Sequence, residues 1–182
     1  MIVIYKSFSA LKTMMILYMY KILRSYSIEL KSYQKFAKGF SLTMHGKKSK
    51  LELNKCSARA NLLLRVENGK LHIGKHVTFN NNCSINCLNN IFIGDNVMFG
   101  ENVLIYDHNH CFNKKNLLIR EQGITLGNVS IGNNCWIGSN SVILMNVEIG
   151  DNVIIGAGSV VTKSVPSNCV AFGNPCKSNK IK

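Results

Sequence analysis

A six-residue repeat in the second half of the chain restricts the fold more than any other feature of the sequence. An aliphatic residue recurs through six consecutive hexads, with Gly next to it in four of them. These aliphatic positions are Ile131, Ile137, Ile143, Ile149, Ile155 and Val161. The same register returns upstream at Ile93, Phe99 and Ile105, and more weakly at Ile73, Phe79 and Ile85. Self-similarity at a fixed short period is typical of a solenoid.

A period of six predicts a solenoid of triangular section, because each hexad supplies one flat side and one corner. Three hexads then close one coil, and the aliphatic residue points inward and stacks on its equivalent in the next coil. We expect Gly and Asn beside it, because the corners need positive φ, which other residues adopt only at a cost. The repeat therefore predicts a parallel β-helix whose ends are capped by atypical segments.

Two interruptions of the period predict segments that leave the solenoid. The spacing from Ile73 to Ile93 is 20 residues, so two extra residues bulge out within 86–90. The spacing from Ile105 to Ile131 is 26 residues, eight more than one coil of 18. That excess begins at the only close pair of histidines, and insertions in solenoids often carry function.

The periodicity divides the chain into four segments. We expect a helical N-terminal extension over residues 1–45, a segment leading into the β-helix over 46–70, the β-helix over 71–166 with an inserted loop at 106–128, and a C-terminal tail over 167–182. The helical prediction rests on apolar residues at three-to-four spacing, such as Met14, Leu17 and Tyr18, and on the absence of Pro and Gly before Gly39.

Composition limits the location and the partners of the protein. Lys and Arg number 22 against 9 Asp and Glu, and residues 1–38 hold seven of these cations and one acid. No DNA- or RNA-binding module is recognised, and no apolar stretch approaches the roughly 18 residues of a membrane-spanning helix. Seven cysteines at irregular spacing predict a reducing compartment. We expect a cytoplasmic protein without nucleic acid, whose basic N-terminus lies on the inner membrane face or packs on the body or a sister subunit.

The repeat and four runs of residues resemble the hexapeptide-repeat O-acetyltransferases, in the maltose, galactoside and surface-polysaccharide branch. The runs are DHNH at 107–110, IGNNCWIGS at 131–139, IGAGSVVTK at 155–163 and GNPCK at 173–177. The resemblance covers roughly residues 70–177. It implies a left-handed parallel β-helix, a homotrimer, acetyl-CoA as the donor, a sugar hydroxyl as the acceptor, and no metal.

Transfer of an acetyl group from a thioester to an alcohol needs a base near the hydroxyl and donors for the developing oxyanion. Histidine suits the first role, since its unperturbed pKa of about 6.5 leaves it mostly neutral near pH 7. By resemblance His110 is the general base, with His108 as the alternative. Asp107 either orients a ring nitrogen or starts a turn. The resemblance makes the backbone N–H of Ser139 the candidate oxyanion donor.

The resemblance also implies contacts with the cofactor and the acceptor. Trp136 falls one residue before an inward aliphatic position, so its ring should face out of the solenoid. It matches a position in the acetyl-CoA and acceptor groove at a subunit interface, and a purely structural trimer contact is the alternative. The other implied acetyl-CoA contacts are Ser139, Ala157, Thr162, Lys163 and Lys177. Asn82 matches an acceptor contact, with a structural role at a corner as the alternative.

The sequence therefore predicts an acetyl-CoA-dependent sugar O-acetyltransferase that works by direct transfer. Residues 41–70 are basic and do not match the shorter N-terminal helix of the maltose type, which favours a role in capsule, O-antigen or exopolysaccharide modification. One alternative is a non-catalytic β-solenoid scaffold or membrane adaptor. A zinc carbonic-anhydrase-type trimer is another, because His72 and His108 lie 36 residues apart, although Asn113 stands where that family has a further histidine.

Overall fold

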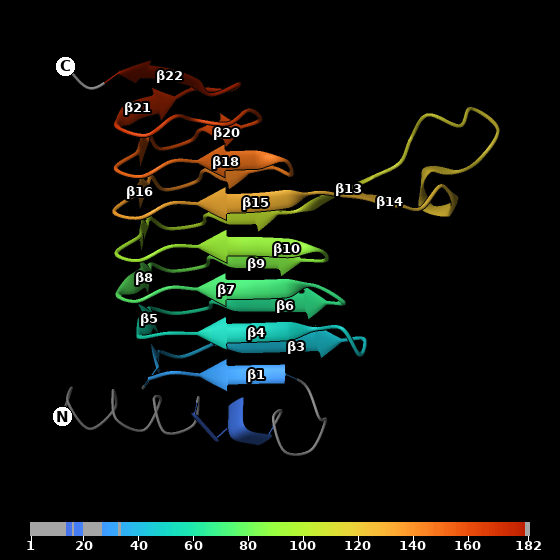
Figure 1. Ribbon diagram of the computed structural model, residues 1–182. Helices are drawn as coiled ribbons and strands as arrows, with labels where there is room; N and C mark the ends of the chain where they lie inside the picture. Colours follow the sequence, from blue (N-terminus) through green and yellow to red (C-terminus); the bar gives the residue numbers. More distant parts are fainter. Residues whose placement is uncertain (1–13, 16, 20–26, 33, 181–182) are drawn as a thin grey trace.

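A computed structural model describes residues 14–15, 17–19, 27–32 and 34–180 of the chain. These residues form a parallel β-helix with three flat faces, and its coils stack along a single axis (Figure 1). The predicted all-β solenoid of hexapeptide repeats is thereby confirmed. Among the described residues, no helix is long and apolar enough to cross a membrane.

Each complete coil contributes one strand to each of the three faces, and the last two strands extend face B alone at the C-terminal end. Face A contains β1 (Ser27–Leu30), β4 (Lys50–Leu53), β7 (Lys70–Ile73), β10 (Asn90–Ile93), β15 (Asn128–Ile131) and β18 (Val147–Ile149). Face B contains β2 (Lys35–Phe36), β5 (Cys56–Ala58), β8 (Val77–Phe79), β11 (Met98–Phe99), β16 (Trp136–Ile137), β19 (Ile154–Ile155), β21 (Cys169–Phe172) and β22 (Lys177–Lys180). Face C contains β3 (Ser41–His45), β6 (Leu63–Glu67), β9 (Ser84–Cys87), β12 (Leu104–Tyr106), β17 (Val142–Ile143) and β20 (Val160–Val161).

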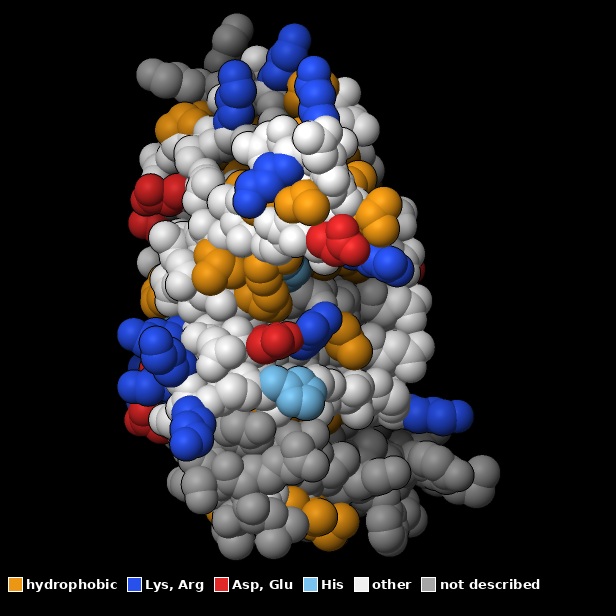
Figure 2. Space-filling view, turned by 90° about the vertical axis from the view of Figure 1, so that its right-hand side faces the viewer, with side chains coloured by type: hydrophobic (Ala, Val, Ile, Leu, Met, Phe, Trp, Pro, Cys, Tyr) orange, Lys and Arg blue, Asp and Glu red, His pale blue; other side chains and the backbone are white. Residues whose placement is uncertain are grey.

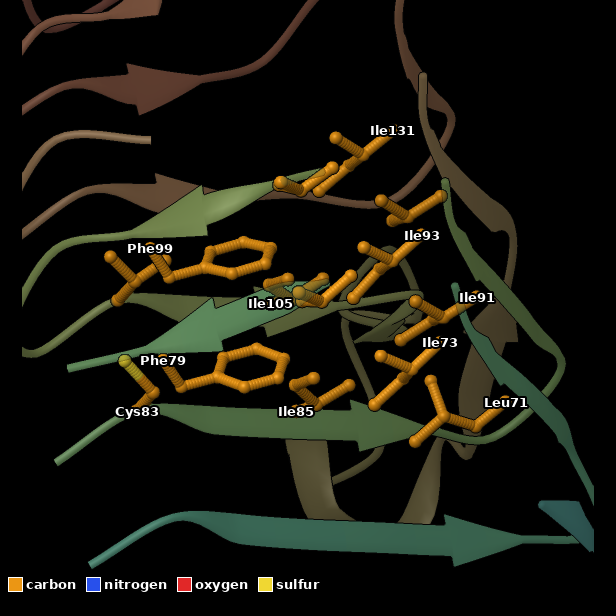
Figure 3. Close-up of a cluster of buried hydrophobic side chains, with 14 of the residues drawn as sticks. Leu71, Ile73, Phe79, Cys83, Ile85, Ile91, Ile93, Phe99, Ile105 and Ile131 are labelled. Carbon is orange, nitrogen blue, oxygen red and sulfur yellow. The ribbon is translucent and has the colours of Figure 1, made fainter. Parts of the chain in front are cut away.

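The core consists of the inward side chains of the hexads, stacked from coil to coil. Ile93 on β10 lies in register with Ile73 below it and Ile131 above it. The rings of Phe79 and Phe99 stack in the same way on face B, with their centroids 4.7 Å apart (Figure 3). These columns are fully buried, so the aliphatic positions read from the sequence are the hydrophobic core.

The corners bear out the prediction for asparagine and only in part for glycine. Gly39, Gly46 and Gly158 have positive φ at corners, but the glycines that directly follow the aliphatic positions do not. Among the described residues, ten asparagines and His76 are the non-glycine residues with positive φ. The glycines that follow the aliphatic positions are there for a different reason. A Cβ at Gly138 would lie 2.5 Å from the backbone nitrogen of Ala157 in the next coil. Only glycine permits this close approach of successive coils.

The β-helix begins earlier than predicted, so the boundaries at residues 45 and 70 are wrong. Strands β1 to β6 fall within 27–67 and pair in parallel with the coils above them. Their inward residues lack the following glycine, and equivalent positions are 20–23 residues apart, as in the pairing of Leu30 with Leu53. Helix occurs at residues 14–15 and 17–19, where Leu17 is buried in the core, and the rest of the predicted helix before residue 27 lies outside the described residues.

The other boundaries need smaller corrections. The predicted tail after residue 166 continues face B with β21, and β22 then pairs antiparallel to it at the end of the sheet. The two-residue bulge is confirmed, because β9 ends at Cys87 and β10 begins at Asn90. The inserted loop is longer than eight residues, because Ile105 and Ile131 lie on consecutive faces rather than stacked. Ile105 stacks on Ile143 instead.

Candidate active site

The inserted loop is a hairpin that projects from the corner between faces C and A, called here the C–A corner (Figure 1). Its strands are β13 (His108–His110) and β14 (Ile124–Leu126), which pair antiparallel so that His108 faces Leu126 and His110 faces Ile124. A 3-10 turn, η1 (Ile119–Glu121), lies in the loop that joins them. The hairpin thus holds both predicted histidines outside the solenoid.

Asp107 fastens the root of this hairpin to the body. Its carboxylate has no exposed surface and accepts hydrogen bonds from the backbone N–H groups of Leu88, at 2.8 Å, and Asn89, at 2.7 Å. These are the two residues of the bulge between β9 and β10, so Asp107 joins the bulge to the root of the hairpin. Burial raises the pKa of the neighbouring Cys87 thiol, and the carboxylate of Asp107 raises it further.

The two histidines occupy different environments. Nδ1 of His108 lies 3.1 Å from Oδ1 of Asp107, and its side chain is largely covered, with an edge contact to the ring of Tyr106. The ring of His110 is exposed and makes no hydrogen bond or ion pair with any residue that the structure describes. Asp107 therefore orients His108 and not His110. The geometry brings both predicted bases to one hairpin, and the choice between them stays a prediction.

Trp136 lies on the outside of face B, as the sequence predicts. Its side chain is 51% exposed, and its neighbours in register are Met98 below and Ile154 above. A cavity of about 900 Å³ extends down this face from Trp136 to Lys35 and Arg59 at its N-terminal end. Sequence reasoning missed Met98, although it precedes Phe99 as Trp136 precedes Ile137. It also missed Lys35 and Arg59 as lining residues, because it assigned residues 1–45 to a helical extension and 46–70 to a segment before the β-helix.

The backbone N–H of Ser139 breaks a pattern that repeats at the corners. The residue after each Ile-Gly or Phe-Gly pair usually donates its N–H to the side chain at the same position of the next coil. Examples are Asp95 to Asn133, at 2.8 Å, and Glu101 to the hydroxyl of Ser139, at 3.0 Å. The position above Ser139 is Ala157, whose methyl group accepts no hydrogen bond. Among the described residues, the N–H of Ser139 has no acceptor.

The remaining predicted residues fall on different sides of the molecule. Ala157 follows β19 at the corner between faces B and C, above Ser139. Asn82 lies at the same corner with φ of 61°, and its side-chain amide bonds Asn61 and Asn102 in an asparagine ladder. Thr162 and Lys163 are exposed at the C–A corner after β20, and Lys177 is exposed at the start of β22.

Within one copy of the chain, the candidate base and the candidate oxyanion donor lie at different corners of the solenoid, His110 at the C–A corner and Ser139 at the corner between faces B and C. The C–A corner, with the hairpin, lies across the solenoid from face B, and Figure 1 shows β16 and the hairpin on opposite sides. The hairpin also exposes a cluster of apolar side chains that nothing in the described chain covers. These are Phe112, Leu117, Leu118, Ile119, Ile124 and Leu126, between 43% and 71% exposed.

Potential metal ligands are dispersed. Within the described ranges, no three His, Cys, Asp or Glu side chains are grouped as they would be to hold a metal ion. His72 stacks on Phe92 of face A and places Nδ1 3.1 Å from Oε2 of Glu52, while His108 faces Asp107 on the hairpin. The two histidines that suggested a zinc site thus have separate partners.

Comparison with known proteins places this architecture in a family. Residues 128–163 match the family model described as bacterial transferase hexapeptide (six repeats). The chain is 43% identical over 108 residues to the galactoside O-acetyltransferase of Escherichia coli, and 40% identical over 107 residues to that of Lactococcus lactis. These matches cover 59% and 58% of this chain, and the chain spans about half the length of both relatives, 52% and 50%.

A solved structure extends the likeness over most of the chain. The maltose O-acetyltransferase of Clostridium difficile is 32% identical, with a TM-score of 0.58, and the match covers 88% of this chain and 72% of that one. The hexads, the projecting hairpin and these similarities together show that the chain belongs to the family of bacterial hexapeptide-repeat transferases.

Proposed function

We propose that this protein is an acetyl-CoA-dependent O-acetyltransferase that acts on a sugar hydroxyl. The observation that carries the proposal is the N–H of Ser139, which is left without an acceptor at the edge of the face that displays Trp136. A backbone N–H held rigidly and unpaired is what a developing oxyanion requires. The relatives' names, galactoside and maltose O-acetyltransferase, support transfer of an acetyl group to a sugar hydroxyl.

The chemistry is a direct transfer. His110 takes the proton of the sugar hydroxyl, and the sugar oxygen forms a bond to the carbonyl carbon of the acetyl group. The negative charge that develops on the carbonyl oxygen is stabilised by the N–H of Ser139. The C–S bond then breaks, the acetyl ester leaves with the sugar, and the proton held by His110 neutralises the CoA thiolate. Acetyl-CoA supplies the activated acetyl group and is consumed as a substrate.

The substrates need a surface that face B provides. Met98, Trp136 and Ile154 form an apolar column suited to the aliphatic arm of acetyl-CoA, and Ala157 leaves space beside it. Lys177 is exposed on β22 of face B and can meet the phosphates of CoA. Thr162 and Lys163 are exposed at the C–A corner, so we propose that they reach the phosphates from a neighbouring copy. We retain Asn82 as a proposed acceptor contact, although its amide already serves the asparagine ladder.

We further propose that the active protein is a homotrimer and that each site is shared by two copies. His110 projects from the C–A corner and Ser139 lies at the corner between faces B and C of the same chain, so we propose that a second copy brings its hairpin to Ser139 at the edge of face B. The exposed apolar cluster of the hairpin supports this arrangement, because a surface of that kind is normally covered by a partner.

The acceptor is proposed to be a capsule, O-antigen or exopolysaccharide unit.

The direct test is release of CoA thiol from acetyl-CoA with a panel of sugars, nucleotide sugars and oligosaccharides. We expect acceptor-dependent release that His110→Ala reduces by about 10²–10⁴-fold. His108→Ala is expected to retain more activity, and Cys111→Ala to retain nearly all of it. No binding or turnover of acetyl-CoA in a folded wild-type trimer would contradict the proposal, and loss of turnover in Cys111→Ala with CoA binding intact would assign the chemistry to a thiol.

A further inference from the structure

A second cavity, of about 740 Å³, lies at the C–A corner, at the root of the hairpin. Its lining, called here the lysine pocket, consists of Lys47, Lys48, Lys50, Asn68, Lys70, Asn89, Asn90 and Asn128. Figure 1 shows the connections from β3 to β4 and from β6 to β7 on the same side of the solenoid as the hairpin. The pocket is therefore separate from the groove of face B on the same chain.

The lysine pocket holds positive charge that no acidic side chain in the described part of the chain neutralises. Lys50 and Lys70 are direct partners in register on β4 and β7, an arrangement in which like charges repel. The nearby acids are already engaged, since Glu52 pairs with Lys31 and His72, and Glu67 with Arg65. Among the described residues, none of the four lysines forms a salt bridge. Figure 2 views the molecule from the side of the hairpin and shows a group of Lys and Arg side chains at its left edge, with acidic side chains close by.

The asparagines of the pocket connect it to the histidine hairpin. Asn89 donates from Nδ2 to the carbonyl oxygen of Gly127 and to Oδ1 of Asn128, both at 3.0 Å. The backbone N–H of Asn89 donates to Asp107, the same carboxylate that lies beside His108. A group bound in the pocket would therefore lie at the root of the hairpin that carries His108 and His110.

We propose that the lysine pocket binds the anionic group, a phosphate ester or a carboxylate, of an acidic saccharide acceptor. The inference rests on the proposed function, because it names the class of acceptor for that site. Four lysines supply the charge, and the side-chain NH₂ groups of Asn68, Asn90 and Asn128 supply hydrogen bonds suited to phosphate, carboxylate and sugar hydroxyl oxygens. The pocket is concave, which suits a small anion better than the flat surface of a lipid bilayer.

The first arm of the test measures binding without acetyl-CoA. Calorimetry at low ionic strength compares galactose 6-phosphate, galacturonic acid and neutral methyl β-galactoside, using wild type, K50Q/K70Q and the control K55Q/K75Q. The control removes the same charge from exposed lysines that do not line the pocket. We expect K50Q/K70Q to weaken binding of at least one anionic sugar by about tenfold, while the control does not. Which of the two sugars binds distinguishes phosphate from carboxylate.

The second arm measures acetyl transfer to the same three sugars. K50Q/K70Q should raise KM for the anionic acceptor by about tenfold and leave kcat/KM for the neutral sugar and the affinity for acetyl-CoA unchanged. Because the substitution relieves repulsion between two opposed lysines, its thermal midpoint should equal or exceed that of wild type.

Three results would overturn the inference. The first is no difference between K50Q/K70Q and K55Q/K75Q in anion binding. The second is an equal loss with every acceptor caused by weaker acetyl-CoA binding, which would assign the pocket to the CoA phosphates. The third is loss of binding to phosphatidylglycerol vesicles with no effect on the sugars, which would assign it to a membrane surface. Anion binding that depends on the pocket, in a protein that transfers no acetyl group, would uphold the pocket and contradict the proposed function.

Discussion

At the scale of single residues, the candidate site depends on two unusual arrangements of backbone N–H groups. At Asp107, a fully buried carboxylate collects two backbone N–H groups and orients a histidine. At Ser139, one N–H that the repeat would normally pair is left open, because the next coil carries Ala157. Both features follow from single side chains and are open to single substitutions.

Asp107→Asn should destabilise the protein by about 1–3 kcal/mol. An amide has one acceptor oxygen, so its NH₂ group would face a backbone N–H of the bulge. Asp95→Asn is the matched control, since Asp95 is only partly buried and an amide oxygen can still accept the bond from the backbone N–H of Lys75. Urea unfolding of both variants checks the expectation, and equal midpoints for the two would show that Asp107 does not hold the hairpin root.

Ala157→Ser should lower kcat by about a hundredfold, because the new hydroxyl can accept the N–H of Ser139 as Ser139 itself accepts that of Glu101. Ala157→Gly keeps the N–H open and should stay within a few-fold of wild type. The acetyl-CoA dissociation constant is measured beside kcat to separate binding from chemistry. An unchanged kcat in Ala157→Ser would remove Ser139 from the mechanism.

How much of this the sequence can predict depends on whether a residue follows the repeat. The outward direction of Trp136 follows from its place in the hexad. The environment of Asp107 does not, because its partners Leu88 and Asn89 are 18 or 19 residues away in a bulge that the repeat only interrupts. The role of the N–H of Ser139 is predicted by the family resemblance alone. Its lack of an acceptor depends on hydrogen bonds between successive coils, which the sequence does not show.

At the scale of elements, asparagine ladders hold the corners together. Asn102 at one corner has φ of 56° and bonds Asn82 below, at 3.1 Å, and Asn140 above, at 2.9 Å. Each ladder residue therefore serves two purposes, a left-handed backbone and a bridge between coils. The sequence predicts positive φ at the corners, but it predicts it also for the glycines that follow the aliphatic positions. Most of the corner residues with positive φ are asparagines instead.

Two substitutions at Asn102 separate these purposes. Asn102→Gly removes the amide and keeps the backbone conformation accessible, so it should cost less than about 1 kcal/mol. Asn102→Ala adds the strain of a left-handed residue with a Cβ, so it should cost about 1–2 kcal/mol more. Chemical denaturation measures both. Equal losses would mean that the ladder bonds and not the backbone conformation determine asparagine at the corners.

The coils that sequence reasoning missed are informative at this scale too. In β3 and β4 the buried residues alternate with exposed ones, as at Leu42 and Met44 or Leu51 and Leu53. Such alternation is the signal of a strand with one buried face. The alternation is short here, and it follows a Lys-rich segment with helical spacing, so the sequence pattern favours helix over residues that form strands.

At the scale of the whole molecule, a solenoid with a long hairpin leaves two surfaces that need a partner. The hairpin exposes Phe112 and Leu118, and face B exposes Met98 and Trp136. Replacing Leu118 and Ile119 together with Asp should convert the proposed trimer into monomers, because charged side chains cannot be buried unpaired at an apolar contact. Sedimentation equilibrium checks the mass of both forms. A wild-type monomer, or a trimer unaffected by the substitutions, would contradict this arrangement.

The central claim is that one copy supplies the histidine and another supplies the oxyanion donor. The measurement that tests it most directly is complementation between two inactive variants, His110→Ala and Ala157→Ser, unfolded together at equal concentration and refolded. In the mixed trimers, an intact site needs the hairpin of an Ala157→Ser chain beside face B of a His110→Ala chain. Each variant supplies half of the chains, so about a quarter of the wild-type activity returns if the hairpin of one chain joins face B of the next. Mixed trimers that stay inactive would show that each chain builds its site alone.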